Sequence, residues 1–408
     1  MHIAYVCHYF VPEPAAPAAR VHEFSRAWVR AGHRVSVVTT FPNHPLGRIP
    51  DEYRGRWWAT EWLDGIRVLR CWVYAVPNRG VGRRGLDHLS FALSSVVCGL
   101  PRLGRPDVVL ASSPTLFSAL SASLMARLLG VPFVLEVRDL WPEAIVELNL
   151  MHPGPTVELL RRLARFLYDR AARVVLVTHA FADRLADQGV PRAKLAVVPN
   201  GADLQLFSPS VDGLAARERL GVHPEQFLVA YVGSHGFSHG LDAVLDAAAS
   251  QPDVGYMLVG AGAERERLVA ERDRRQLANV RMLPSVPKAE VPGLYAAADV
   301  CLVPLRDVPL FETFVPSKLF EVLAAGRPIV GAVRGEAREI LRRSGGALLV
   351  DPGNGAAMAE AVAHLRADPL LRTSLGRQAR AFAEQHYDRD MLAAGYLDLL
   401  REVVARRR

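Results

Sequence analysis

Lys318 and Glu321 are the residues whose spacing points most directly to chemistry. They lie three positions apart in the segment VPSKLFEVLAAGRP, residues 315–328. Pro316 suits a helix start and Gly326 a helix stop, so the segment predicts a short helix with both charges on one face. A carboxylate there can accept two hydrogen bonds from a ribose diol, and a lysine can neutralise a departing diphosphate. The alternative is a solvent-facing ion pair worth only about 0.3–0.5 kcal/mol.

Two glycine-containing connections follow apolar strands in the second half of the chain. The first, after FLVAYV, consists of Gly233, Ser234, His235 and Gly236 and leads into a helix from about Gly240. The second, after YMLV, begins at Gly260. Small residues let the backbone approach a ligand, and a helix N-terminus offers free N–H groups to an anion. We expect a diphosphate at the first connection and a nucleotide base at the second, with plain turns as the alternative.

Polar residues also follow strands in the first half. The segment RDLWPE ends the apolar strand PFVLEV and supplies Arg138, Asp139 and Glu143. Ligands of open parallel sheets bind beyond the carboxyl ends of the strands, so we expect these residues to hold an acceptor. Asp139 is also a weaker candidate for a general base. Neighbouring strands end in Ser112, Ser113, Thr178 and His179.

The loop after the first strand, HYFVPEPAAPAAR, lacks the pattern G-x-G-x-x-G. Its absence weighs against an NAD-dependent enzyme. Because the loop is rich in proline and alanine, it can pass close to a ligand while remaining stiff. Its candidates for acceptor contact are Glu13, Pro14 and Arg20. An ordinary connection between a strand and a helix is the alternative.

Short apolar runs alternate with helical patterns along the whole chain, which predicts parallel sheets covered by helices. In the first half we expect strands at 2–7, 34–39, 66–73, 107–111, 132–137, 174–177 and 195–198, and helices at 20–31, 116–129 and 180–188. In the second half we expect strands at 227–232, 256–259, 280–283, 300–303, 329–330 and 347–350. Its helices are expected at 241–249, 264–276, 317–325, 336–341, 356–365 and 391–408.

The fold class is therefore α/β, with two doubly wound Rossmann-like domains facing a central cleft. The turn signal Pro199-Asn200-Gly201 separates the alternating strands and helices of the first half from those of the second. We expect one domain at 1–203 and the other at 204–387, followed by a last helix at 388–408.

The composition excludes several classes of protein. Of the 408 residues, 50% are hydrophobic and 22% charged, which excludes long disorder, collagen and small disulfide scaffolds. No apolar run reaches the ~18 residues of a membrane-spanning helix, and no secretory signal is visible. Four scattered cysteines without a C-x-x-C pair predict reduced core thiols in a cytoplasmic protein.

The net charge of +7 lies entirely in the first half. Residues 1–203 hold 24 basic and 17 acidic residues, whereas residues 204–408 hold 25 of each. This asymmetry favours contact with an anionic surface, and drift in an arginine-rich sequence is the alternative. Three arginines precede an apolar helical pattern within 79–100, which suits either a membrane interface or a core helix. We expect no nucleic-acid partner.

The pair Asp388 and Asp390 forms a D-x-D pattern that can hold a metal ion on a nucleotide diphosphate. Here the pattern precedes the final helix instead of following a buried strand. We therefore interpret it as a helix cap and expect no metal site.

The chain resembles family 4 glycosyltransferases of the GT-B architecture, in the branch that builds bacterial surface polysaccharides. The matching segments run in the family's order over nearly the whole length: HYFVPEP, GHRVSVVTT, SSPT, RDLWPE, VVPNGAD, GSHGFSHGLD, ADVCLVPL and PSKLFEVLAAGRP.

The resemblance implies transfer of a sugar from a nucleotide donor, a UDP-sugar in our interpretation, with retention at the anomeric carbon and without a metal ion or other cofactor. It implies that the second domain binds the donor and the first the acceptor. It also implies that the last helix packs back on the first domain.

The resemblance also carries site residues over. Glu321 matches the second of two family glutamates, whereas Thr313 stands at the first, beside Glu312. The family's basic residue in the phosphate loop is absent, and His235 lies nearby. The implied donor contacts are Gly233, Ser234, His235, Gly236, Gly260, Val286, Thr313, Ser317, Lys318 and Glu321. Lys318, Asp139 and Glu312 are the catalytic candidates, and Glu312 with Thr313 would contact the sugar.

The acceptor stays open at this point. A lipid-linked glycan precursor would place the protein on the inner face of the plasma membrane, and a soluble molecule such as an antibiotic precursor is the alternative. A nucleotide-sugar epimerase would need no acceptor, and a non-catalytic protein would bind the nucleotide without transfer. Hydrolysis of nucleotide sugars discriminates among these classes.

Overall fold

The computed structural model describes residues 1–13, 16–44, 46–76, 81–113, 115–148 and 151–407. The chain forms two compact units. The N-terminal unit comprises Met1–Pro199 and Asp390–Arg408, and the C-terminal unit comprises Asn200–Arg389. The sequence-based boundaries at 203 and 388 lie a few residues from these.

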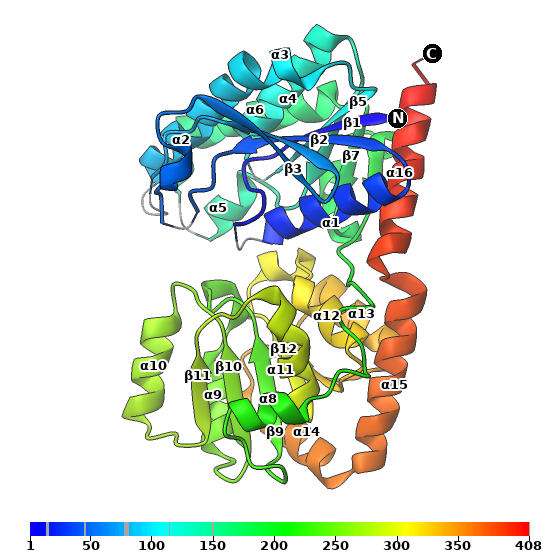
Figure 1. The fold of residues 1–408 in the computed structure, drawn as a ribbon. Coiled ribbons are helices and arrows are strands. Elements are labelled where there is room, and N and C mark those ends of the chain that lie inside the picture. The colour runs from blue at the N-terminus through cyan, green and yellow to red at the C-terminus, as the bar shows by residue number, and fades with distance from the viewer. Residues whose placement is uncertain (14–15, 45, 77–80, 114, 149–150, 408) are drawn as a thin grey trace. The chain divides into compact units, whose positions relative to one another are not determined.

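The N-terminal unit contains an eight-stranded sheet (Figure 1) with the order β3-β4-β2-β1-β5-β6-β7-β8. Its strands are β1 (His2–Val6), β2 (Arg34–Thr40), β3 (Trp58–Leu63), β4 (Ile66–Cys71), β5 (Val108–Ser112), β6 (Phe133–Val137), β7 (Arg173–Leu176) and β8 (Leu195–Val197). All neighbouring strands pair in parallel except β3, which pairs with β4 in antiparallel register, Leu63 opposite Ile66. The central strands β1, β5 and β6 are buried along their whole length, as expected when helices cover both faces.

The helices of this unit connect successive strands. They are α1 (Ala16–Arg30), α2 (Val81–Ser94), a π-helical turn η2 (Ser95–Gly99), α3 (Leu100–Leu103), α4 (Leu116–Leu129), α5 (Glu143–Glu147), α6 (Pro155–Arg170) and α7 (His179–Asp187), with 3₁₀ turns η1 (Asp51–Tyr53) and η3 (Arg192–Lys194). Thr178 caps α7, because its hydroxyl accepts a hydrogen bond from the Phe181 N–H.

The last helix, α16 (Arg389–Ala405), belongs to the N-terminal unit although it ends the chain. The Trp28 indole donates a hydrogen bond of 2.9 Å to the Ala393 carbonyl oxygen. The Tyr396 ring packs edge-on against Phe24 and Trp28 of α1. Asp390 of the D-x-D pattern forms an ion pair with Arg30, 2.6 Å apart.

The C-terminal unit has a six-stranded, wholly parallel sheet with the order β11-β10-β9-β12-β13-β14. Its strands are β9 (Leu228–Val232), β10 (Gly255–Val259), β11 (Val280–Leu283), β12 (Val300–Pro304), β13 (Ile329–Ala332) and β14 (Ala347–Val350). Its helices are α8 (Leu214–Arg219), α9 (Asp242–Ala249), α10 (Arg265–Arg274), α11 (Val291–Ala297), α12 (Ser317–Ala324), α13 (Gly335–Ser344), α14 (Gly355–Ala367) and α15 (Pro369–His386). The 3₁₀ turns are η4 (Phe237–His239), η5 (Lys288–Glu290) and η6 (Pro309–Thr313).

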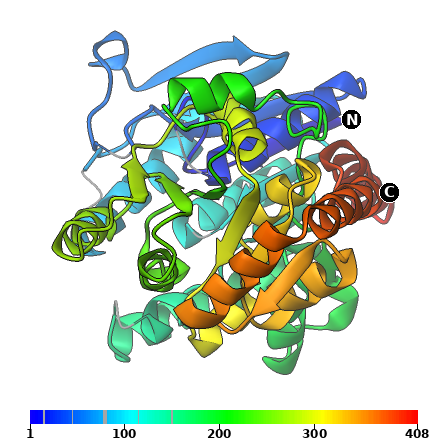
Figure 2. The same cartoon turned by 90° about the horizontal axis from the view of Figure 1, so that it is seen from below.

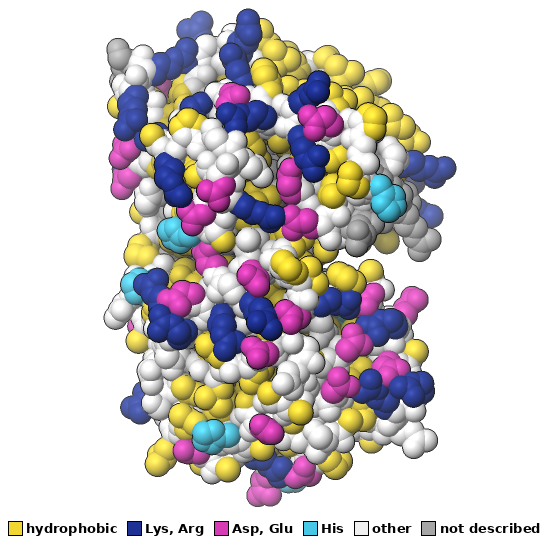
Figure 3. Space-filling view, turned by 180° about the vertical axis from the view of Figure 1, so that it is seen from behind, with side chains coloured by type: hydrophobic (Ala, Val, Ile, Leu, Met, Phe, Trp, Pro, Cys, Tyr) yellow, Lys and Arg dark blue, Asp and Glu magenta, His cyan; other side chains and the backbone are white. Residues whose placement is uncertain are grey.

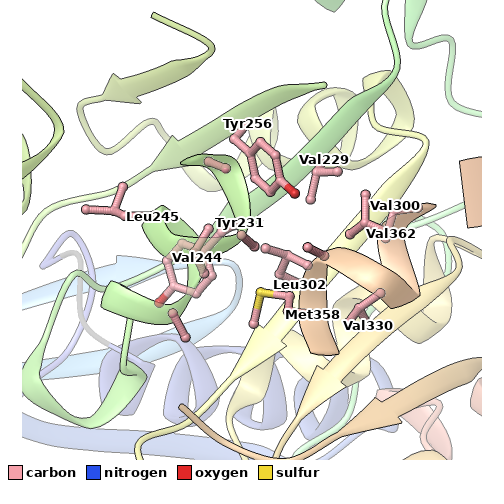
Figure 4. Packing of buried hydrophobic residues seen from close by; sticks show 14 of the residues in the cluster. Val229, Tyr231, Val244, Leu245, Tyr256, Val300, Leu302, Val330, Met358 and Val362 are labelled. Atoms are coloured by element: carbon pink, nitrogen blue, oxygen red, sulfur yellow. The ribbon is translucent and has the colours of Figure 1, made fainter. Parts of the chain in front are cut away.

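The core of this unit follows the two-residue period of its strands. Val229 and Tyr231 of β9 face the same side as Val300 and Leu302 of β12, where they pack with side chains of α9 and α14 (Figure 4). Residues between them face the other side. Figures 1 and 2 show the helices on both sides of the sheet.

Both units thus have the doubly wound α/β architecture predicted from the sequence. Strand β3 and the helices α6, α8, α11 and α15 were not predicted from the sequence. The patterns of β3 and α6 mix charged and aromatic residues. The expected first helix begins at Ala16, not at residue 20, and includes Pro17. A proline is tolerated in the first helical turn, where its missing N–H is not needed. The four cysteines are buried free thiols, as predicted.

Candidate active site

Lys318 is the most unusual residue of the C-terminal unit. It lies in the first turn of α12, only 8% exposed, with Nζ 3.6 Å from the centroid of the Tyr231 ring. Nζ has no hydrogen-bond partner among the described residues. Burial lowers the pKa of Lys318 well below its ordinary value, and Glu321 opposes that change. The solvent-facing ion pair that the sequence left open is therefore wrong.

The connection after β9 lies directly over this lysine. A Cβ atom on Gly233 would lie 2.6 Å from Lys318 Nζ, and the φ angle of +148° is one that L-residues rarely adopt, so glycine is favoured there. The Tyr231 hydroxyl, at the far end of the ring beneath Nζ, donates a hydrogen bond of 2.5 Å to the Ser234 carbonyl oxygen. Tyr231 therefore supports both the loop and the lysine. Tyr231 was not predicted as a site residue, because in the sequence it is one of several apolar residues in the strand FLVAYV.

His235 is fully buried at the point where two loops meet. Its backbone N–H donates to the Ala261 carbonyl oxygen in the loop after β10, 2.9 Å away. Both ring nitrogens are buried, and no described residue offers them a hydrogen-bond partner. Burial, aided by the charges of Arg265 and Lys318, lowers the pKa of His235 to about 4, so the ring is neutral at pH 7.

Glycines permit this close contact of the two loops. A Cβ atom on Gly260 would lie 1.8 Å from the Gly233 carbonyl oxygen, and one on Gly262 would lie 2.5 Å from the His235 carbonyl oxygen. These distances are shorter than any real contact, so side chains at these positions would separate the loops. Gly236 and Ser234 belong to the same turn, and the Ser234 side chain is exposed.

Glu321 shares a helix with Lys318 but contacts different residues. The Tyr295 hydroxyl donates to Glu321 Oε2 at 3.4 Å, and Lys288 Nζ lies 3.9 Å from Oε1. Its carboxylate is partly exposed. The two charged residues of α12 thus have different contact partners, although the charge of Glu321 still acts on Lys318.

The remaining candidates of this unit lie in connections that follow strands. Glu312 is exposed in η6, and the Thr313 hydroxyl donates to the Leu310 carbonyl oxygen at 2.8 Å. Ser317 and Val286 are half-buried, the latter in the connection after β11. Since β11, β10, β9 and β12 are parallel neighbours, the connections after them lie at one edge of the sheet.

A buried carboxylate organises the corresponding edge of the N-terminal sheet. Glu136 of β6 is fully buried and accepts hydrogen bonds from Tyr5 at 2.8 Å, Ser112 at 3.0 Å and Arg20 at 3.1 Å. Burial alone would raise the pKa of Glu136, but the Arg20 and Arg138 charges and these hydrogen bonds outweigh it and lower the pKa. The sequence analysis missed Glu136, although a charge inside the run PFVLEV cannot face water in a buried strand.

Arg20 connects this carboxylate to the end of the sheet. Its guanidinium also donates to the carbonyl oxygens of Val198 and Pro199, at 2.8 and 2.9 Å. Glu13 is buried as well, and its Oε1 accepts the backbone N–H groups of Asn43 and His44, both at 2.9 Å. Both buried side chains, Glu13 and Arg20, therefore hold backbone groups in place near the ends of the strands. Pro14 lies outside the described residues.

Arg138 and Asp139 follow Glu136 at the end of β6. The Arg138 backbone N–H donates to Ser113 Oγ at 3.0 Å. Its Nε and Nη1 atoms are buried and have no hydrogen-bond partner within the described part of the chain. Burial raises the pKa of Asp139 to about 6, although the Arg138 charge opposes that shift. Glu143 forms an ion pair of 3.2 Å with Arg161 of α6.

Each unit thus has polar groups that burial leaves without a partner. Among the described residues these groups include Lys318 Nζ and both His235 nitrogens in the C-terminal unit, and two guanidinium nitrogens of Arg138 in the N-terminal unit. Buried polar atoms in native proteins nearly always have a partner, so these groups indicate ligand sites. Cations and N–H donors suit anionic or hydroxyl-rich ligands.

Comparisons with known proteins show the family to which the chain belongs. A family model described as "Glycosyl transferase 4-like domain" matches residues 16–201, and one described as "Glycosyl transferases group 1" matches residues 214–382. The chain is 31% identical over 408 residues to a D-inositol 3-phosphate glycosyltransferase of Xylanimonas cellulosilytica, covering 95% of this chain and 91% of the relative.

Two further proteins are similar over nearly their whole length. One is the putative colanic acid biosynthesis glycosyl transferase WcaI of Escherichia coli, 27% identical over 390 residues, which are 92% of this chain and 93% of that protein. The other is Alr3699/HepE of Anabaena, whose crystal structure is a complex with UDP-glucose. Its fold matches with a TM-score of 0.74 at 19% identity, over 98% of this chain and 100% of that one.

The protein is therefore a glycosyltransferase, an enzyme of the hexosyltransferase type. It belongs to the family 4 glycosyltransferases with the GT-B architecture, as the sequence motifs predict.

Proposed function

We propose that the enzyme transfers a sugar, with retention at the anomeric carbon, from a UDP-sugar to a lipid-linked glycan precursor of a surface polysaccharide. The observation that carries the donor assignment is the buried, unpartnered Lys318 Nζ beneath the Gly233 connection. The fold similarity to a protein crystallised with UDP-glucose supports a nucleotide-sugar donor. The similarity to WcaI, named for colanic acid biosynthesis, supports a polysaccharide product.

In this proposal the donor diphosphate lies over the turn Gly233–Gly236. The glycine connections bring backbone N–H groups close to the phosphates, and Lys318 supplies the positive charge. An approaching diphosphate also restores the charged form of the lysine, because an opposite charge offsets burial. Glu321 holds the ribose diol, and the connection that begins at Gly260 borders the base.

Catalysis then depends on positioning and electrostatics. As the bond to the sugar breaks, negative charge grows on the departing diphosphate, and Lys318 stabilises that charge. The departing phosphate takes the proton of the acceptor hydroxyl on the same face, so no pair of carboxylates is needed. Glu312 and Thr313 contact the sugar. The proposal includes no metal ion at the diphosphate.

The acceptor contacts belong to the N-terminal unit. The two unpartnered nitrogens of Arg138 suit an anionic group, such as the diphosphate of a lipid-linked precursor. Asp139, whose pKa burial raises to about 6, orients the acceptor hydroxyl, with a general-base role as the weaker alternative. Glu143 adds a second polar contact.

A lipid-linked acceptor also requires contact with a membrane surface, and the N-terminal unit has a suitable face. Leu86, Leu89 and Leu93 form an exposed stripe on α2, which Val97 continues. The neighbouring α4 exposes a second stripe consisting of Leu120, Leu124 and Leu128. Figure 3 shows hydrophobic side chains gathered at the upper right of this unit, with basic side chains nearby. We call these seven residues the apolar face.

The occupant that we propose for the apolar face is an anionic lipid bilayer. Exposed Arg83 precedes the first stripe and exposed Arg127 lies within the second, so cations accompany the apolar side chains. This combination is typical of helices that lie in a membrane interface. In the part of the chain that the structure describes, no helix is long and apolar enough to cross a bilayer.

Slow hydrolysis of nucleotide sugars by the purified protein tests the proposed function. Transferases of this kind let water replace the acceptor, so one UDP-sugar of a panel should release UDP without any acceptor present. Conversion of the sugar without UDP release would instead indicate an epimerase. Binding of UDP without any turnover, even with lipid-linked acceptors, would indicate a non-catalytic protein, and transfer to soluble acceptors without detergent would contradict the lipid assignment.

A further inference from the structure

His8, Asp87 and His88 form a cluster in the N-terminal unit that the transfer reaction does not use. His8 follows β1, and the other two residues belong to α2. One potential ligand atom of each residue lies within 4.8 Å of those of the other two. All three residues are buried, with exposed fractions of 2%, 6% and 9%. It is the one such cluster in the part of the chain that the structure describes.

The contacts within the cluster leave polar atoms unsatisfied. His8 Nε2 and Asp87 Oδ1 lie 3.2 Å apart, yet neither has a hydrogen-bond partner among the described residues. Ligand atoms bound tetrahedrally to one zinc ion at about 2.0–2.1 Å lie about 3.3–3.4 Å from each other. The observed separation therefore fits two ligands that meet at an ion.

The surroundings hold His8 in place. The hydroxyl groups of Thr39 and Thr40 both donate to the His8 carbonyl oxygen, at 3.3 and 3.0 Å. The rings of Tyr9 and Phe91 pack edge-on against the His8 imidazole, with centroids 4.7 and 5.4 Å away. Metal ligands in proteins are typically oriented by contacts of this kind.

We propose that His8, Asp87 and His88 bind one divalent transition-metal ion of the zinc class, with water as the fourth ligand. Two imidazoles and one carboxylate are the ligand set that such an ion prefers over magnesium or calcium. A single ion binds only one nitrogen of His8. The contact of 3.4 Å between His8 Nδ1 and His88 Nδ1 then lies outside the coordination shell or is broken when the ion binds. The sequence alone does not indicate this site, because only the fold brings His8 close to Asp87 and His88.

Cobalt titration of the full-length protein tests this site. After treatment with EDTA and dialysis into chelator-free buffer, we expect uptake of one Co²⁺ per chain with the visible absorption of a tetrahedral complex. One equivalent of Zn²⁺ should displace it. Asp87→Asn and His88→Gln should each weaken cobalt binding at least ~10-fold, since the loss of a mere outer-shell contact already costs that much.

Two matched variants sharpen the test. Asp64→Asn alters an exposed carboxylate that lies 2.8 Å from His22, and cobalt binding should be unchanged. Arg84 lies close enough to His88 for its charge to act on that ring, so Arg84→Met should bind cobalt more tightly than the wild type. Absence of stoichiometric uptake, or uptake that Asp87→Asn and His88→Gln leave unchanged, would overturn the proposal. UDP binding by the same variants reports separately on the donor site.

Discussion

At the scale of single residues, Lys318 and Glu321 provide the sharpest separation of roles. Glu321 would hold the ribose equally in the ground state and the transition state, so Glu321→Ala should mainly weaken UDP-sugar binding. In the proposed mechanism Lys318 stabilises charge that develops during the reaction, so Lys318→Ala should lower turnover by ~100-fold or more while donor affinity falls less. Calorimetry and turnover measurements on both variants separate these effects. Near-normal binding and turnover in both would show that the donor lies elsewhere.

The effect of burial on the Asp139 carboxyl group can be tested by measuring the stability of the protein. Its pKa is about 6 in the folded protein and 3.8 in the unfolded chain, so the folded state binds the proton more tightly. This contribution to stability is complete below pH 3.8 and is lost as pH rises through 6. Asp139→Asn should therefore raise the free energy of unfolding by roughly 1–2 kcal/mol at pH 8 and change it little at pH 4.

Urea denaturation at both pH values provides the measurement for Asp139→Asn. The control is Asp187→Asn, at an exposed position in α7, which should behave alike at both pH values. Equal effects of Asp139→Asn at pH 4 and pH 8 would show that burial does not perturb this carboxyl group.

At the scale of elements, the close contact between the connections after β9 and β10 can be tested by substituting a glycine. Gly260→Ala would place a methyl group 1.8 Å from the Gly233 carbonyl oxygen and force the connections apart. We expect a loss of about 1–3 kcal/mol in the free energy of unfolding and a loss of UDP binding. Gly395→Ala in α16, where a Cβ atom meets nothing within 4 Å, should instead stabilise the protein by about 0.5–1 kcal/mol. Equal effects of the two substitutions on stability would contradict this account.

Some elements of the fold can be predicted from the sequence and others cannot. Strands such as β1 and β9 are continuous apolar runs and were predicted within a residue or two, because parallel strands covered on both faces admit little else. The edge strand β3 was not predicted, since its residues WATEWL combine one glutamate with two exposed tryptophans and do not form a continuous apolar run. The positions of Lys318 and Glu321 on α12 followed from spacing.

The surroundings of these residues did not follow from spacing. Burial of Lys318 against Tyr231 depends on a strand far away in the sequence, and so do the partners of Glu136. The cluster of His8, Asp87 and His88 was likewise invisible, because hydrogen bonds and ligand geometry depend on tertiary contacts.

At the scale of the whole molecule, the basic first half and the apolar face predict reversible binding to membranes. The protein should co-sediment with vesicles that contain anionic lipid at low salt. Salt should weaken the association, because exposed charges are screened over about 8–10 Å. Leu89→Asp with Leu93→Asp should abolish it, whereas Leu214→Asp, at an exposed leucine of the C-terminal unit, should not. Equal recovery in the supernatant with and without vesicles would refute the membrane assignment.

The most direct test of the central claim is the stereochemistry of donor cleavage in the presence of EDTA. Proton NMR of the UDP-sugar that the enzyme hydrolyses records the anomer that forms first, before the free sugar equilibrates. The account predicts UDP release at an undiminished rate with the chelator, together with a first-formed sugar of the same anomeric configuration as the donor. An inverted first product, or activity that EDTA abolishes and manganese restores, would contradict it.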